Sequence, residues 1–199
     1  ESINQIKIEK LHDYRIGVIK NEPFEPVQSE IRTIFDAAIL QLESMGAQIV
    51  DVEIPELKHT IAAEFAIICF EAGYYHKDRL IDYASKIDTD IKYLLIAGNL
   101  LPTEHYFRGL QARKLISDAI RRCFDDYQLS VIATPTLPAP VAKTDETDFR
   151  YGDYDEPVTI SYVRTTAPFN LAGIPALSTP CGLDSNGLPV GLQIAGRAM

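Results

Sequence analysis

The sequence FNLAGIPALSTPCG, residues 169–182, combines features of a buried strand with features of a turn. Its apolar side chains suit a protein core: Leu171, Ala172, Ile174, Ala176 and Leu177. Glycine permits backbone conformations and close approaches that other residues resist, and proline fixes φ and removes a donor. We therefore expect a strand that packs tightly behind a site. Its glycines and prolines, and those that follow, would shape the scaffold without contacting a ligand: Pro175, Gly182, Gly187 and Pro189.

The residues around this stretch predict a short helix and a pair of strands. We expect the helix around 162–172 and the strands at 176–179 and 190–195. Asp184-Ser185-Asn186-Gly187 lies between the strands and is typical of a turn, because Asp, Asn and Gly favour turn backbone angles. The C-terminal part of the chain therefore predicts a helix followed by two strands.

The N-terminal part predicts a strand, a helix and a second strand. RIGVIK at 15–20 and QIVDVEI at 48–54 are the strands. Between them, residues 26–45 repeat apolar side chains at helical spacing. These are Ile31, Ile34, Phe35, Ala38, Leu42 and Met45, and Gly46 follows as a C-cap. Because strand, helix and strand at this spacing form a βαβ unit, the two strands are expected to be parallel.

The middle of the chain is expected to be mainly helical. Two helical pieces are predicted over 57–86, a further helix around 89–98, and the longest helix over 104–126. Thr103 would cap the longest helix at its N-terminus.

A further strand, SVIAT at 130–134, leads into a proline-rich segment at 135–140. Proline lacks an N–H, so this segment is not expected to continue the ladder. The acidic residues 142–160 are expected to form a loop. The predicted class is α/β, a mixed β-sheet flanked by helices in α/β/α layers. Loops that leave the C-terminal ends of strands build the sites of such folds, and the proline-rich segment is such a loop.

The composition excludes several classes of protein. The 199 residues carry a formal net charge of −9, which argues against non-specific nucleic-acid binding, since that requires positive charge. No apolar run approaches the ~20 residues of a membrane span, and Glu1–Lys10 shows no signal-peptide pattern. We therefore expect neither a nucleic-acid partner nor a membrane.

The three cysteines, Cys69, Cys123 and Cys181, are odd in number and far apart. No Cys or Cys/His spacing typical of zinc occurs, so no metal site is expected. Unpaired thiols fit a reducing compartment, which favours the cytoplasm. The sequence also lacks GxSxG, Walker, HExxH and GxGxxG motifs, and its four histidines are scattered. The chain thus predicts no self-contained catalytic set.

Two spaced Gly/Pro patterns near the C-terminus point to a family. Asn170-Leu-Ala-Gly-Ile-Pro-Ala-Leu-Ser178-Thr-Pro-Cys-Gly182 is followed by Gly187-Leu-Pro-Val-Gly-Leu-Gln-Ile-Ala-Gly196. Together they resemble the closing segment of amidase signature enzymes, serine amidohydrolases with the pattern NxxGxPAxSxPxG and then GLPxGxQxxG. Thr134-Pro-Thr136 with Pro138-Ala-Pro140 resembles the PT-x-P-x-AP loop of that family. The expected long helix, with Tyr106, Gln111 and Arg113, resembles the family's helix before that loop, and the resemblance covers roughly residues 13–199.

The resemblance implies hydrolysis of a small-molecule amide by a serine nucleophile, a second serine in a cis peptide and a lysine base. A glycine-rich loop would form the oxyanion hole, and no metal or organic cofactor is needed. The family's Lys and Gly/Ser-rich stretch lie in its N-terminal half, and this chain has no such stretch. We therefore assign no catalytic residue to this chain.

The resemblance makes residues 1–199 the C-terminal part of a single amidase domain, without its N-terminal catalytic half and its final helix. An incomplete sheet would expose unpaired edges and apolar surface. We expect such a chain to associate with the N-terminal half of the same protein or with another copy as a homo-oligomer.

Four residues are candidates for substrate binding: Arg164, Thr134, Thr136 and Asn170. Arg164 would line the substrate cleft or form a structural salt bridge. In glutamine-using amidotransferases, an aspartate of the amidase-like chain lies seven residues before the NLAG asparagine, and here that position is Val163. The arginine that holds the carboxylate there is replaced near Tyr93-Leu94. An amidase is thus favoured over the A subunit of a glutamine-dependent tRNA amidotransferase, and a non-catalytic binding or scaffold domain of the same fold is the third alternative.

Overall fold

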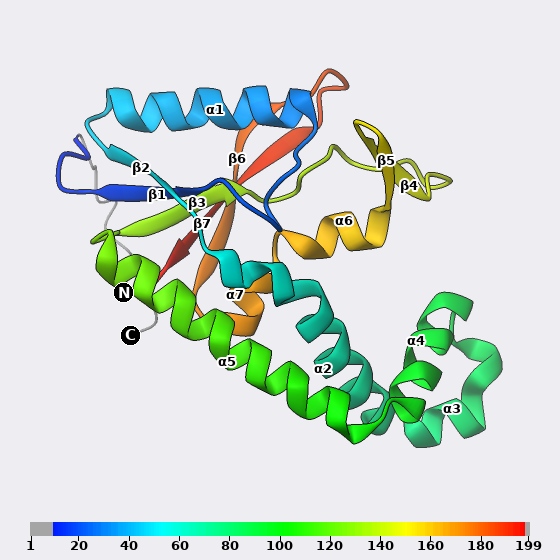
Figure 1. Ribbon diagram of the computed structural model, residues 1–199. Helices are drawn as coiled ribbons and strands as arrows, with labels where there is room; N and C mark the ends of the chain where they lie inside the picture. Colours follow the sequence, from blue (N-terminus) through cyan, green and yellow to red (C-terminus); the bar gives the residue numbers. More distant parts are fainter. Residues whose placement is uncertain (1–9, 198–199) are drawn as a thin grey trace, which may run out of the picture.

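The computed structural model describes residues 10–197, and it is built around a five-stranded sheet of order β2-β1-β3-β7-β6 (Figure 1). β1 is parallel to both β2 and β3, whereas β7 is antiparallel to β3 and β6. The strands of this sheet are β1 (Arg15–Ile19), β2 (Gln48–Val52), β3 (Val131–Pro135), β6 (Ala176–Leu183) and β7 (Pro189–Gly196). The predicted mixed sheet and parallel βαβ unit are confirmed.

Helices cover both faces of the sheet. On one face, α1 packs Phe35 against a core that contains Ile16, Val18, Ala133 and Leu192. On the other face, α2, α5 and α7 enclose the larger core. The helices are α1 (Ser29–Ser44), α2 (Thr60–Tyr75), α3 (Lys77–Tyr83), α4 (Thr89–Leu100), α5 (Thr103–Asp126), α6 (Val158–Arg164) and α7 (Ala167–Ala172), with 3-10 helices η1 (Pro55–His59) and η2 (Ala84–Lys86). The α/β/α layering is thus confirmed.

A helical arm extends away from the sheet. It consists of the distal parts of α2 and α5 together with α3 and α4 (Figure 1). The crossing of α2 and α4 is close because of Gly98: a Cβ there would lie 1.7 Å from the carbonyl oxygen of Cys69. Asn99 adds a bond across the same crossing, since its Nδ2 donates to the carbonyl of Gly73 at 2.9 Å.

Two expectations about the ends of elements were wrong. The long helix begins at Thr103 itself, and Pro102 occupies the N-cap without a side-chain hydrogen bond. β3 extends through Pro135, which pairs with Leu192, and the N–H of Thr136 donates to Gly191 at 2.8 Å. Successive N–H groups of a strand point to opposite sides, so the missing donor of Pro135 faces β1. The pairing of β1 ends at Ala133, so no donor is needed there.

Two segments have more structure than expected. Residues 142–160 contain a hairpin of β4 (Asp148–Tyr151) and β5 (Tyr154–Pro157), which turns at Gly152, where φ is +58°. The expected helix over 162–172 is instead two helices, α6 and α7, because α7 starts anew with Pro168 in its first turn. The polar stretch at the start of the chain lies largely outside the described residues. Within residues 10–197, no helix is long and apolar enough to cross a membrane.

We predict that Gly98→Ala lowers the free energy of unfolding by about 1–3 kcal/mol, because the new methyl group would overlap the α2 backbone. The control is Gly109→Ala in α5, whose Cβ would approach side-chain atoms of Ile67 at 3.1 Å and Ala66 at 3.2 Å, so that shifts of a few tenths of an ångström suffice. Alanine also has the higher helix propensity, which offsets part of that cost. Urea unfolding of both variants measures the difference. Equal stability of the two variants would contradict the backbone overlap.

Candidate functional site

The loops that follow β1 and β3 meet at the carboxyl end of the sheet. The N–H of Gln28, at the end of the first loop, donates to the carbonyl of Pro138 in the second at 2.8 Å. The first loop contains two cis peptide bonds, Glu22-Pro23 and Glu25-Pro26. Ligands of open α/β sheets bind outside the carboxyl ends of the strands, so these loops define the candidate site.

Gln193 of β7 organises the floor of this site. Its Nε2 donates to the Thr134 hydroxyl and to the Thr165 carbonyl, both at 3.0 Å. Thr134 is 1% exposed, so its hydroxyl belongs to the interior. The Thr165 hydroxyl donates in turn to the Thr136 carbonyl at 2.8 Å. β3, β7 and the break between α6 and α7 are therefore joined through satisfied buried polar groups.

Thr136 and Ser178 form a hydroxyl pair across β7. Their Oγ1 and Oγ atoms lie 2.6 Å apart. Gly191 of β7 makes this possible, because a Cβ there would lie 2.6 Å from the Thr136 hydroxyl and 2.8 Å from that of Ser178. Both hydroxyl residues line a cavity of about 240 Å³, whose other walls are mainly apolar and include Ile31, Leu137 and Val190. The cavity combines mainly apolar walls with the polar side chains of Thr136, Ser178 and Asp184, as small-molecule sites do.

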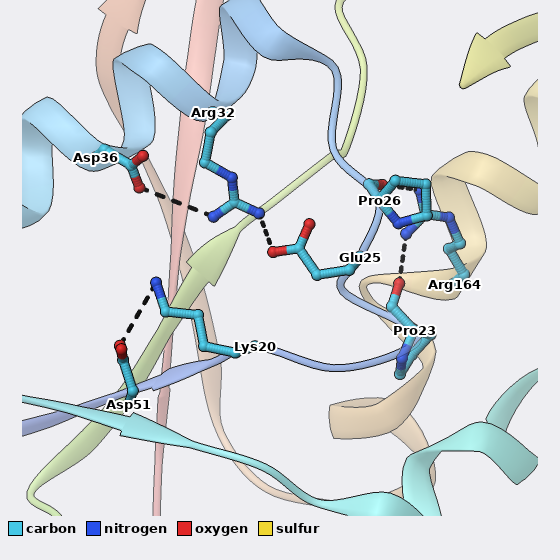
Figure 2. Close-up of polar contacts among 8 residues, drawn as sticks. All are labelled: Lys20, Pro23, Glu25, Pro26, Arg32, Asp36, Asp51 and Arg164. Carbon is cyan, nitrogen blue, oxygen red and sulfur yellow. Dashed lines mark hydrogen bonds and ion pairs between the residues drawn. The ribbon is translucent and has the colours of Figure 1, made fainter. Parts of the chain in front are cut away.

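Arg164 holds the first loop from the side of α6. Figure 2 shows its guanidinium reaching the segment of Pro23 and Pro26, and it donates to the carbonyls of both. Its Nε donates to Glu156 at 2.9 Å, and its Cζ lies 5.2 Å from the centre of the Tyr151 ring. All three guanidinium nitrogens are thus engaged, and the predicted structural salt bridge is present.

Arg32 anchors the same loop from α1. It pairs with Glu25 of the loop and, at 3.8 Å, with Asp36 one helical turn further on (Figure 2). The loop is therefore tied on one side to α1 and on the other to α6. Such double anchoring orders a loop that would otherwise be mobile, since each contact opposes the entropy of the free chain.

The four predicted residues do not share one cavity. Thr134 and Thr136 are joined through Gln193 and Thr165, and Arg164 immediately precedes Thr165 in the chain. Asn170 lies exposed on α7 and does not line the cavity beside Thr136. Substrate contact by these residues stays a prediction.

Sequence reasoning missed three members of the site. Ser178 and Gln193 are fixed letters of the two C-terminal patterns, so those patterns carried a signal for them. Thr165 had none, because its role depends on backbone groups from distant segments.

The cavity contains no nucleophile paired with a base among the residues of 10–197 that line it. Asp184 is their single ionisable side chain, and its Oδ1 already accepts from the N–H groups of Asn186 and Leu188 at 2.9 and 2.8 Å. Serine chemistry needs a base within hydrogen-bond reach of the hydroxyl, and among residues 10–197 no base bonds to Ser178. The described residues can therefore bind and orient a molecule but do not form a nucleophile.

The site lies beside an open edge of the sheet. β6 is the last strand in the order, and within the described residues it pairs on one side only, with β7. Leu177 and Leu183 of β6 are 63% and 65% exposed. An open strand with exposed apolar side chains is a template for pairing with another segment.

We predict that Arg164→Lys lowers the free energy of unfolding by about 2–4 kcal/mol, because the single nitrogen of a lysine cannot reach all three acceptors that the separate guanidinium nitrogens of Arg164 reach. The control is Arg150→Lys, whose partner Asp155 lies at the surface and whose change should cost less than about 0.5 kcal/mol. Chemical unfolding of both proteins tests this. A similar small loss in both would show that the buried contacts of Arg164 contribute little.

We further predict that Gly191→Ala separates the hydroxyls of Thr136 and Ser178 and lowers the free energy of unfolding by about 1–3 kcal/mol. Gly196→Ala on the same strand is the control, since its Cβ would come no closer than 3.7 Å to Pro175. Thermal unfolding compares the two variants, and two equal melting temperatures would refute the close approach at Gly191.

The chain matches the family model Amidase over residues 2–199. It is 33% identical over 175 residues to an amidase of Pseudomonas putida, covering 87% of this chain and 37% of that protein. It is also 33% identical over 210 residues to the A subunit of glutamyl-tRNA(Gln) amidotransferase from Brevibacillus brevis, covering 92% of this chain and 41% of that protein. A solved amidase structure superposes with a TM-score of 0.86 at 21% identity, over 94% of this chain and 42% of that one. The chain thus spans about two fifths of the length of these relatives, and it belongs to the amidase family.

Proposed function

We propose that this chain is the C-terminal part of an amide hydrolase, which converts a carboxylic amide into an acid and ammonia or an amine. The observation that carries the proposal is the family match over residues 2–199. The 33% identity to an amidase and the shared fold point the same way. The preceding half of the enzyme would supply the catalytic residues.

The proposed chemistry is covalent catalysis by a serine, a second serine in a cis peptide and a lysine. The nucleophilic serine attacks the amide carbon, and its proton passes through the second serine and the lysine to the departing nitrogen. The C–N bond breaks, an acyl-enzyme remains, and water then releases the acid. The absence of a base beside Ser178 supports a division in which this chain contributes walls rather than the nucleophile.

Within this division, Thr136 is the best placed of the four proposed substrate-binding residues, because it lines the cavity with Ser178. Thr134 would support it from behind through Gln193. Arg164 would position the loop of Pro23 and Pro26. Asn170, exposed on α7, would act on a substrate only together with residues from the other half of the domain.

The N-terminal half of the same protein is the proposed partner of the β6 edge. The free edge of β6 and the exposed side chains of Leu177 and Leu183 support this assignment. A second copy of the chain is the alternative occupant, which would give a homo-oligomer. We also propose a cytoplasmic location, since Cys69, Cys123 and Cys181 are free thiols.

A component of a glutamine-dependent amidotransferase is the second candidate function. The 33% identity to the Brevibacillus brevis protein favours it, whereas Val163 disfavours it. Val163 lies half-buried in α6 and offers no charge for the amino group of glutamine. Release of glutamate from glutamine, compared with hydrolysis of a simple aliphatic or aromatic amide, separates the two candidates.

We predict no amide hydrolysis by the 199-residue chain alone and ammonia release when it is refolded with the N-terminal half of the Pseudomonas putida amidase. The physical reason is that nucleophile and base would reach the cavity only across the β6 edge. Ammonia release and co-elution on size exclusion measure the outcome, and the N-terminal half alone is the control. Turnover by this chain alone would overturn the proposed division of labour.

A further inference from the structure

A second cavity, here called the arm pocket, is lined by residues of α2 and α5. Figure 1 shows that these two helices extend into the helical arm, away from the sheet. The arm pocket has a volume of about 620 Å³ and lies between the last two turns of α2 and the start of α5. Its polar and aromatic lining consists of Phe70, Glu71, Tyr74, Tyr75, His76 and Tyr106. None of these residues takes part in the site described above.

The arm pocket is walled by aromatic rings. Phe70 and Tyr106 stack with their ring centres 4.5 Å apart and an interplanar angle of 16°. Tyr75 meets His76 edge to face at 4.8 Å. Tyr74 and Tyr75 are 79% and 75% exposed, so they add little to the core of this chain. An aromatic face presents negative charge density to whatever lies over it, which favours cations.

A carboxylate completes the pocket. Glu71 accepts a hydrogen bond from the Tyr106 hydroxyl at 2.9 Å, and no Lys, Arg or His of residues 10–197 forms an ion pair with it. That hydrogen bond raises the pKa of Tyr106, so the phenol stays protonated and keeps its donor. Arg113, two turns along α5, acts on Tyr106 in the opposite direction, and its Nε is bound to the Leu171 carbonyl. Glu71 is exposed, so the pocket presents a solvated carboxylate that forms no ion pair within the described residues.

We propose that the arm pocket binds a small organic cation of the alkylammonium class, with a quaternary ammonium group as the best fit. Such a group is weakly hydrated and gains from the aromatic faces, while Glu71 balances its charge. A neutral apolar molecule of the same shape gains no such attraction from the rings or from the exposed carboxylate. This proposal does not depend on the amidase chemistry, because the pocket and its test need only the present chain.

The test compares choline with its uncharged carbon isostere, 3,3-dimethylbutan-1-ol, by calorimetric titration of the 199-residue chain. Choline is expected to bind in a saturable manner, about fivefold to tenfold more tightly than the isostere, as cation–aromatic attraction provides. Because the chain has no tryptophan, tyrosine fluorescence follows the same titration. Equal affinity for the two compounds, or no saturation by roughly 50 mM choline, would overturn the proposal.

Variants locate the binding. Glu71→Gln should weaken choline binding about fivefold or more and leave the isostere unchanged, and Tyr106→Phe should weaken it less, since the ring is kept. Glu43→Gln is the matched control, because it removes one negative charge from an exposed position at the end of α1. Unchanged choline affinity in Glu71→Gln, or an equal loss in Glu43→Gln, would show that the arm pocket is not a cation site. Circular dichroism verifies that each variant is folded.

Discussion

The burial of the Arg164 charge is the constraint on which the carboxyl end of the sheet depends. A charge out of water must be paired and hydrogen-bonded, or it costs several kcal/mol. Here Glu156 of the hairpin and the carbonyls of Pro23 and Pro26 satisfy it. These groups lie on segments far apart in the sequence, so satisfying one guanidinium fixes the hairpin, α6 and the first loop together. The geometry of the candidate site follows from this arrangement.

Strand β7 connects the sheet to the candidate site. It pairs with a neighbouring strand on each side. On one face it carries the long amide side chain of Gln193 and, two residues earlier, Gly191, which has no side chain. The amide joins the sheet to the α6–α7 break, and the glycine leaves room for the hydroxyl pair. Glycine in this part of the sequence suggests a turn, but Gly191 instead lies within the strand and lets the Thr136 and Ser178 side chains approach each other.

The sequence predicted those features that depend on local periodicity. The parallel strands around α1 and the long α5 follow from apolar spacing, and their cores form as that spacing requires. The β4–β5 hairpin was missed because acidic composition masks it, although Gly152-Asp153 between two strand-like runs was a hairpin signal. The partners of Gln193 lie 59 and 28 residues away, so only the folded chain brings them to it. Arg164 was recognisable as a lone charge, but its carbonyl partners were not.

The cavity beside Thr136 and Ser178 offers hydroxyl groups to a ligand, whereas the arm pocket offers a carboxylate. In the Thr136–Ser178 pair, one hydroxyl hydrogen is used within the pair, so a single O–H remains to donate elsewhere. No other side chain of the described residues bonds to either hydroxyl, and the pair lies beside the open edge of β6. Because the pair is exposed, water can accept that hydrogen, and a substrate or segment that covers the edge would have to supply an acceptor in its place. The arm pocket, in contrast, holds its negative charge within one compact helical unit, where it can attract a cation whether or not the β6 edge is covered.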